Sequence, residues 1–293
     1  MYMLNIEEDI LMLLNKDIPY SLRVNTPYGV LTCREIVKSI NDASMFGGKS
    51  FNDVLKDEKS ISFAKKLLYM DNKEVSMENI KSILRKGGGF PTNFKPSLAK
   101  SIYFRFCKEG DTCLDYSAGF GGRLLGCLCT GKNLRYIGFE PNTKASLELN
   151  KLGLKVKEVV KDDSSFRIIN DISENIGHHI DCNSVDVAFS CPPYYRYEEY
   201  CSEETQSIVK YPLYEDWLNG YVLETIKGIH KVLKTGGFFL VYLMNVKIEG
   251  VYYNLIDDWV HIAEKVGFST EGYDVVNKDF SIAGKSCLII LRK

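Results

Sequence analysis

Two segments of the chain carry residues whose types and spacing could do chemistry. The first, Leu114–Gly126, passes from an apolar run through a cluster of glycines into a helical pattern. A strand, a glycine turn and a helix in that order let backbone N–H groups approach a nucleotide-like ligand. The glycines, Gly119, Gly121 and Gly122, do not have the spacing of the dinucleotide-binding fingerprint. The second segment, Val185–Tyr195, is an apolar strand that ends in two prolines and two tyrosines.

Carboxylates recur at the ends of the predicted strands. Asp115 ends the strand before the glycines, Glu140 ends the next strand, and Asp163 follows a third. Ligands of an open parallel sheet bind beyond the carboxyl ends of its strands. There, Glu140 could accept two ribose hydroxyls, and Asp163 could accept the exocyclic amine of an adenine ring. Each carboxylate taken singly also fits a loop or helix-cap role, but their ordered recurrence favours a ligand site.

The elements that would position these groups alternate between strand and helix. The pattern predicts strands at 112–116, 135–139, 156–160, 185–190 and 238–243, helices at 122–129, 143–152, 213–233 and 252–266, a loop or short helix at 164–175, and a terminal antiparallel pair at 269–276 and 286–292. Such alternation is typical of a parallel sheet with helices on both faces. We therefore predict an α/β fold.

Residues 1–88 show helical rather than strand patterns. Helices are predicted at 6–14, 33–40 (capped by Thr32), 51–55, 61–70 and 76–84, with an extended segment and a turn over 20–32. The triple glycine at 87–89 marks a boundary or a mobile loop. We predict a small helical N-terminal domain at 1–88 and a second domain at 89–293 that opens with a helix at 97–106.

Composition narrows the class of protein. With 293 residues, 45% of them hydrophobic, the chain can bury one large core or two modest ones. No apolar run approaches the roughly 20 residues that span a bilayer, and Glu7, Glu8 and Asp9 stand where a secretory signal would be basic. The nine cysteines are odd in number and scattered, which indicates free thiols in a reducing compartment. We expect a cytoplasmic protein without a bound metal, because neither the cysteines nor the four histidines have ligand spacing.

One stretch is basic although the net charge of the chain is −1. Between Lys81 and Lys108 there are seven Lys or Arg residues, no Asp or Glu, and several interleaved aromatics. This pattern predicts a surface that faces phosphates, with Lys86, Lys95 and Arg105 as contacts. A solvated helix face followed by a core helix is the alternative.

These segments resemble the class I S-adenosylmethionine-dependent methyltransferases, and within them the amino-methylating nucleic-acid enzymes. Asp115–Gly121 is similar to the cofactor loop of that family. Cys191–Tyr194 is similar to its catalytic motif, usually Asp, Asn or Ser followed by Pro-Pro-Tyr. Tyr197–Tyr200, Tyr211-Pro212 and Trp217 are similar to the bacterial restriction-modification and phage-encoded members. The resemblance covers residues 90–293.

The resemblance implies a Rossmann-like sheet of seven strands and S-adenosylmethionine as the cofactor. It assigns Glu140 to the ribose and Asp163 to the adenine side. The cofactor-binding residues that it implies are Phe94, Lys95, Pro96, Asp115, Ser117, Ala118, Gly119, Phe120, Gly121, Glu140, Pro141, Asp163, Ser164 and Ser190. The implied catalytic residues are Ser190, Cys191, Pro192, Pro193 and Tyr194.

The chemistry of such a motif can be stated independently. An exocyclic amine is a poor nucleophile because its lone pair is delocalised into the ring, so the site must accept its hydrogens and turn the lone pair toward the methyl group. The carbonyl of Pro192 is free to accept, and Tyr194 would stack on a base turned out of its duplex, with Tyr195 in support. The substrate-binding residues that we predict are Tyr194, Tyr195, Tyr197, Lys86, Lys95 and Arg105.

Cys191 departs from the motif. A neutral thiol is a weak acceptor, so the amine would depend more on Pro192 or on Ser190. A cysteine nucleophile that adds to a pyrimidine for carbon methylation is an alternative, although in that family the cysteine follows the proline. A further alternative is that the prolines and tyrosines only cap a strand.

We therefore predict methyl transfer to an exocyclic amine of DNA, either adenine N6 or cytosine N4. The alternatives are an RNA amino-methyltransferase, a protein glutamine methylase and a cofactor-binding module without activity. The polar segment 196–210 should lie over the target pocket and order on substrate binding. The N-terminal domain is expected to recognise the target or to cover the cofactor. The sequence leaves the choice of base, the recognition sequence and the oligomeric state open.

Overall fold

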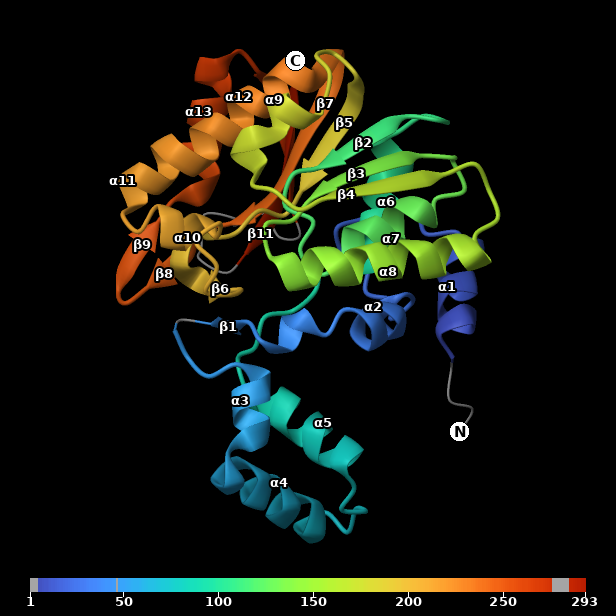
Figure 1. Ribbon diagram of the computed structural model, residues 1–293, viewed down its shortest axis with the longest axis vertical. Helices are drawn as coiled ribbons and strands as arrows, with labels where there is room; N and C mark the ends of the chain where they lie inside the picture. The colour runs from blue at the N-terminus through green and yellow to red at the C-terminus, as the bar shows by residue number, and fades with distance from the viewer. Residues whose placement is uncertain (1–4, 46, 276–284) are drawn as a thin grey trace.

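A twisted sheet of seven strands forms the centre of the protein (Figure 1). The computed structural model describes residues 5–45, 47–275 and 285–293. The strand order is β10-β11-β7-β5-β2-β3-β4, in which β7 to β4 run parallel, β11 is antiparallel to β7 and β10 is antiparallel to β11. The strands are β2 Thr112–Asp115, β3 Arg135–Phe139, β4 Ser165–Ile169, β5 Val185–Ser190, β7 Leu233–Met244, β10 Ser269–Val275 and β11 Ser286–Arg292. The predicted α/β fold with a Rossmann-like sheet of seven strands is confirmed.

Helices cover both faces of this sheet, so its central strands are apolar on both sides. Successive residues of a strand point to opposite faces: Cys113 packs with α6, α7 and α8, whereas the next residue, Leu114, packs in the core that holds α12 and α13. These helices are α6 Pro96–Phe106, α7 Gly122–Leu128, α8 Thr143–Val159, α12 Leu223–Val232 and α13 Leu255–Val266. The chain order reverses between β2 and β5, where a Rossmann-like sheet binds its ligands.

The first two helices belong to the core of the sheet. Helix α1 spans Ile6–Asn15 and α2 spans Val30–Ile36. Ile10, Leu13 and Cys33 are buried in the core that contains α6 and α7. The buried carboxylate of Asp9 accepts from the backbone N–H of Gly29 at 2.9 Å and from the hydroxyl of Thr32 at 2.7 Å. Thr32 therefore ties α2 to α1, and the prediction that it caps a helix at 33–40 is wrong.

Three further helices form a separate helical unit, α3 Phe51–Lys56, α4 Glu58–Met70 and α5 Met77–Gly87. They share a small core of their own and stand apart from the sheet (Figure 1). The packing thus divides the N-terminal region differently from the predicted domain 1–88. Only the helical unit is separate, and the described residues before it pack with the sheet.

The third strand lies later in the chain than predicted. The predicted strand 156–160 is wrong, because Leu149, Leu152 and Val156 recur at helical spacing and are buried on one face of α8, which continues to Val159. Strand β4 lies instead at Ser165–Ile169, in the segment predicted as a loop or short helix. Asp163 and Ser164 consequently precede the strand instead of following it.

The elements in the second half of the sheet domain agree more closely with the sequence prediction. The predicted helix 213–233 consists of α11 Tyr214–Trp217, a π-helical turn and α12. A hairpin of β8 Val246–Ile248 and β9 Val251–Tyr253 replaces the start of the predicted helix 252–266. The terminal antiparallel pair is confirmed through Val275, and residue 276 lies outside the described residues.

The remaining elements are η1 Ser39–Asn41, β1 Ser44–Met45, η2 Ser173–Asn175, α9 Ile176–His179, η3 Tyr195–Tyr197, β6 Glu198–Glu199 and α10 Ser207–Lys210. Among the described residues, no helix has the length and apolarity needed to cross a membrane.

Lys100 shows that the basic stretch is not one surface. Its ammonium is buried and donates to the carbonyls of Leu13, Leu14 and Lys16 at 2.7, 2.8 and 2.8 Å, which are orphan acceptors at the end of α1. Burial lowers the pKa of Lys100. Its charge therefore fixes α1 on α6 and is not available to phosphates.

We expect Lys100→Met to lower the free energy of unfolding by about 2–4 kcal/mol, because three carbonyls, that of buried Leu13 among them, lose their donor. Lys108→Met removes an exposed lysine and should change stability by no more than about 0.5 kcal/mol. Urea denaturation followed by circular dichroism measures both. Equal stabilities of the two variants would contradict the capping role.

Candidate active site

A cavity of about 520 Å³ lies beyond the carboxyl ends of the strands. Its walls come from the turn after β2, the turn after β3, the segment after β5 and the loop 196–210, which we name the cavity loop. The structure thus brings the two segments of chemical interest to one place. The predicted site residues that line the cavity are Phe94, Lys95, Ser117, Gly119, Phe120, Glu140, Pro141, Cys191, Pro192, Pro193, Tyr194 and Tyr197.

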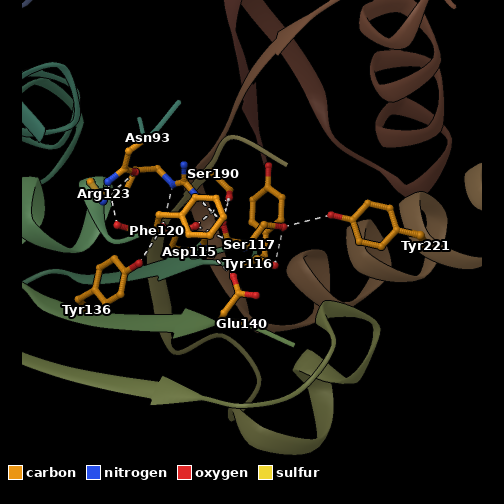
Figure 2. Close-up of polar contacts among 12 residues, drawn as sticks. Asn93, Asp115, Tyr116, Ser117, Phe120, Arg123, Tyr136, Glu140, Ser190 and Tyr221 are labelled. Atoms are coloured by element: carbon orange, nitrogen blue, oxygen red, sulfur yellow. Dashed lines mark hydrogen bonds and ion pairs between the residues drawn. The ribbon is translucent and has the colours of Figure 1, made fainter. Parts of the chain in front are cut away.

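Asp115 organises the floor of this site without lining the cavity (Figure 2). Its fully buried carboxylate accepts from Arg123 Nε at 2.8 Å, from the hydroxyl of Tyr136 at 2.7 Å and from the hydroxyl of Ser190 at 2.7 Å. The ends of β2 and β5, the start of α7 and a tyrosine near the start of β3 are therefore joined at one carboxylate. Asp115 and Ser190 were predicted as ligand contacts. They do not line the cavity, and their hydrogen bond instead holds together the elements that do.

Arg123 is a site residue that the sequence analysis missed. It lines the cavity, is nearly fully buried, and also donates to the carbonyl of Ser117. Its guanidinium carbon lies 5.4 Å from the ring centroid of Phe94. Burial acts to lower the pKa of Arg123, but the charge of Asp115 together with the neighbouring Cys191 and Tyr136 outweighs burial, and the pKa is raised. A lone arginine inside an otherwise apolar helix pattern was the available signal.

The turn after β2, Ser117–Gly122, is the glycine loop. Gly119 and Gly121 have φ of 60° and 87°, where glycine is favoured. A Cβ at Gly122 would lie 1.8 Å from the carbonyl oxygen of Phe94, so the segment before α6 lies directly against the loop. Asn93, also missed from sequence, holds the two together by donating to the carbonyl of Phe120 at 2.8 Å. Ala118 and Gly121 shape the loop without lining the cavity, and Pro96 begins α6.

Glu140 joins the glycine loop to the next turn. One carboxylate oxygen accepts from the N–H of Gly119 at 2.8 Å and the other from the N–H of Asn142 at 2.9 Å. Burial raises the pKa of Glu140 to about 7, against the lowering effect of these two donors. A carboxyl group placed on a cavity wall in this way can still accept further hydroxyl donors on its remaining lone pairs.

Cys191 and Tyr194 contact each other in the segment after β5. The Cys191 sulfur lies 3.0 Å from the Tyr194 hydroxyl. Burial raises the pKa of the Cys191 thiol to about 11, although the charge of Arg123 lowers it. The thiol is therefore neutral at physiological pH, and it shares one hydrogen bond with the Tyr194 hydroxyl.

Tyr195 points away from the cavity. It has φ of 55°, is 3% exposed, and donates from its hydroxyl to the carbonyl of Pro212 at 2.6 Å. Its ring packs on Tyr214 and Trp217 with centroid distances of 5.1 and 5.6 Å. Tyr195, which we predicted to contact substrate, instead anchors the segment after β5 in the aromatic core. A non-glycine residue at this φ costs about 1 kcal/mol or more, which the aromatic core offsets.

The cavity loop lies over the cavity, as its position in the sequence predicted. Its strand β6 pairs with β1 through Glu198 opposite Met45, and Met45 also lines the cavity. Glu203 accepts from the N–H of Thr143 at 3.1 Å, which fastens the loop to the first turn of α8. The hydroxyl of Tyr200 donates to Glu198 at 2.6 Å.

Four predicted residues lie elsewhere. Asp163 and Ser164 sit at the amino end of β4, where Asp163 is exposed and donates its N–H to Asn133. Asp163 was assigned to the adenine side on the expectation that it follows the third strand, and that expectation is wrong. The residues that follow β4 and line the cavity are Ser173 and its neighbours. Lys86 is exposed on α5.

Arg105 lies ten residues beyond Lys95, or ~15 Å along α6, and does not line the cavity. Among the described residues, no group of three or more His, Cys, Asp or Glu side chains could hold a metal ion.

Comparison with known proteins gives remote similarity in structure only. No protein-family model matches the chain, and no curated protein matches it. TrmN from Thermus thermophilus is 14% identical with a TM-score of 0.47 over 68% of this chain and 48% of its own, so this chain spans about half of that protein. A SAM-dependent methyltransferase from Methanosarcina mazei is 13% identical with a TM-score of 0.45, over 66% of this chain and 96% of its own. Fibrillarin from Aeropyrum pernix, solved with natively bound S-adenosyl-L-methionine, is 13% identical with a TM-score of 0.41, over 66% of this chain and 73% of its own.

The raised pKa of Glu140 predicts a dependence of stability on pH. An unfolded glutamate ionises near pH 4.5, whereas the folded group ionises near pH 7. Between these values the folded protein keeps a proton that the unfolded chain releases, so this contribution to stability falls as pH rises through that window and is constant above it. Glu140→Gln should lack the fall, which amounts to at most ~1.4 kcal/mol per pH unit. Urea denaturation across the window measures the difference, and parallel profiles of the two proteins would refute the assignment.

Proposed function

We propose that this protein transfers a methyl group from S-adenosylmethionine to an exocyclic amine, adenine N6 or cytosine N4, in DNA. The observation that carries the proposal is that the glycine loop, Glu140 and the Pro192-Pro193-Tyr194 segment line one cavity. The cavity volume of about 520 Å³ is in the range of small-molecule sites. The methyl donor and the target would therefore meet inside one enclosure.

The residues present fit the proposed cofactor. The glycine loop has no side chain at Gly119, where the nearest atoms to an added Cβ lie 3.8 Å away or more, so a ligand can approach its backbone. Glu140 offers carboxylate oxygens to ribose hydroxyls at the end of β3. When bound, S-adenosylmethionine supplies an electrophilic methyl group on a positively charged sulfur. Phe94, Ser117 and Ser173 would complete the walls around it.

The chain would act on the amine by orientation. The carbonyl of Pro192 accepts one N–H, which turns the nitrogen lone pair out of the ring plane and toward the methyl group. Tyr194, on the cavity wall, stacks on the base and excludes water. The neutral thiol of Cys191 disfavours the alternative of carbon methylation, since nucleophilic addition to a pyrimidine requires a thiolate.

The helical unit is the proposed contact for the nucleic-acid backbone. Exposed Lys56 of this unit pairs with Asp53, but five other exposed lysines form no ion pair with another described residue: Lys59, Lys65, Lys66, Lys81 and Lys86. On the same unit Phe63 and Tyr69 are 61% and 80% exposed. Lysines interleaved with exposed aromatics suit a phosphate backbone with accessible bases.

A methyl-transfer assay with radiolabelled donor over DNA, RNA and protein tests the proposal. Nucleoside analysis of labelled DNA should give N6-methyladenine or N4-methylcytosine. Label in RNA or on glutamine would replace the proposed substrate by one of the alternatives. Donor binding by calorimetry without transfer to any acceptor would identify a binding module without activity.

Gly119→Ala should weaken binding of the donor at least ~10-fold, because the added methyl enters the space that the ligand must occupy. Gly131→Ala is the matched control, since Gly131 has φ of 71°, close to the 60° of Gly119, and has nothing within 4 Å of an added Cβ. Both variants should lose similar stability, but only the first should lose affinity in calorimetry. Equal affinities would remove Gly119 from the site.

Tyr194→Ala should lower kcat/KM roughly 100-fold through loss of base stacking, with donor affinity almost unchanged. Tyr194→Phe keeps the ring and loses only the contact with Cys191, so it should retain most of the activity. Steady-state kinetics on an unmethylated oligonucleotide gives both values. An alanine variant as active as the wild type would exclude Tyr194 from the target pocket.

A further inference from the structure

Glu198 is a carboxyl group on the cavity wall that the mechanism above does not use. It lies on β6 in the cavity loop, opposite Met45 of β1, and lines the same cavity as Cys191 and Tyr194. One carboxylate oxygen accepts from the Tyr200 hydroxyl at 2.6 Å. Within the described part of the chain, the other oxygen accepts no hydrogen bond and no Lys or Arg forms an ion pair with the group.

Glu198 lies near both the segment proposed to hold the target amine and the loop proposed to hold the methyl donor. It lines the same cavity as the segment after β5, and its charge adds to burial in raising the pKa of the Cys191 thiol and of the Tyr194 hydroxyl. Its partner Tyr200 packs edge-on against Phe120 of the glycine loop, with ring centroids 5.9 Å apart. The Glu198 carboxylate is thus held between the segment after β5 and the glycine loop.

The site lacks an acceptor at the position where one is needed. An exocyclic amine carries two N–H groups, and the Pro192 carbonyl accepts only one of them. Cys191, the residue before Pro192, is a neutral thiol already in contact with the Tyr194 hydroxyl at 3.0 Å. A thiol is a weak acceptor even when free. A second acceptor for the amine must therefore come from another part of the cavity.

We propose that the Glu198 carboxylate accepts the second N–H of the target amine and takes its proton. This inference rests on the proposed amino-methyltransferase function. The nitrogen lone pair forms the N–C bond while the C–S bond of the sulfonium donor breaks with its electrons going to sulfur. One N–H bond then breaks, its electrons return to nitrogen and its proton moves to Glu198, which later releases it to solvent. The products are a neutral secondary amine, a neutral thioether and a proton.

The protonation behaviour of Glu198 agrees with this role. Burial raises its pKa above the ordinary value, against the lowering effect of the Tyr200 hydroxyl, which makes the carboxylate a stronger base than a solvated one. The titratable groups that face it, Cys191, Tyr194, Tyr197 and Tyr200, have pKa values raised by burial and remain neutral. The single-turnover rate should therefore fall as pH is lowered through the pKa of Glu198.

The test compares three variants in single-turnover kinetics. Glu198→Ala should lower the rate at least ~100-fold, in the range of a lost general base. Glu198→Gln, which preserves shape, should also be slow and should lose the acid limb of the pH profile. Adding Cys191→Asn to Glu198→Ala should recover at least ~10-fold, because the asparagine carbonyl supplies the missing acceptor. Glu204→Gln, at an exposed position of the same loop, should behave as the wild type.

Two readouts separate this role from a structural one. Donor affinity by calorimetry should be unchanged in Glu198→Gln, and its free energy of unfolding should not be lowered, because the substitution removes a buried charge. If the wild type methylates DNA and Glu198→Ala stays within about threefold of its rate, the inference fails and the proposed function stands. If the wild type methylates no amine, both fail together. A slow Glu198→Ala that Cys191→Asn does not rescue, with an unaltered acid limb in Glu198→Gln, would reduce Glu198 to a loop-packing residue.

Discussion

The buried ion pair between Asp115 and Arg123 is the constraint on which the site depends. Both side chains are almost completely excluded from water, with 0% and 5% of their surfaces exposed. A buried charge is tolerated only when it is paired and its other hydrogen-bonding positions are filled. Tyr136, Ser190 and the Ser117 carbonyl fill those positions. The need to satisfy two charges thus fixes β2, β3, β5 and the glycine loop relative to one another.

Much of the fold could be predicted from the sequence because its strongest patterns are local. Strands 135–139 and 185–190 have the predicted bounds, since each is a short apolar run between turn signals. The third strand could not be placed, because a short apolar run such as Val156–Val160 fits a buried helix face equally well. That one error also displaced the carboxylate assigned to the adenine side. A functional assignment from the end of a strand is only as good as the strand's placement.

The site was harder to predict where contacts join distant parts of the chain. Asn93 and Arg123 have ordinary sequence surroundings, and their roles arise from contacts with the glycine loop. Tyr195 looks equivalent to Tyr194 in sequence, yet its positive φ turns it into the aromatic core. Lys100 looked like part of a basic surface, but α1 covers it. The hydrogen-bond partners of Arg123 lie within eight residues of it, but for Asn93, Tyr195 and Lys100 the deciding neighbour lies far away in the chain.

The pairing of β1 with β6 has a consequence for communication across the molecule. This two-stranded ribbon joins the segment that leads into the helical unit to the loop above the cavity. Any ligand that shifts β6 must also shift β1, and with it the attachment point of the helical unit. By thermodynamic reciprocity, a ligand that bound the helical unit and displaced β1 would change the affinity of the cavity, and a ligand in the cavity would change the affinity of the helical unit by the same factor. Occupancy of the helical unit and occupancy of the cavity would then be one coupled equilibrium.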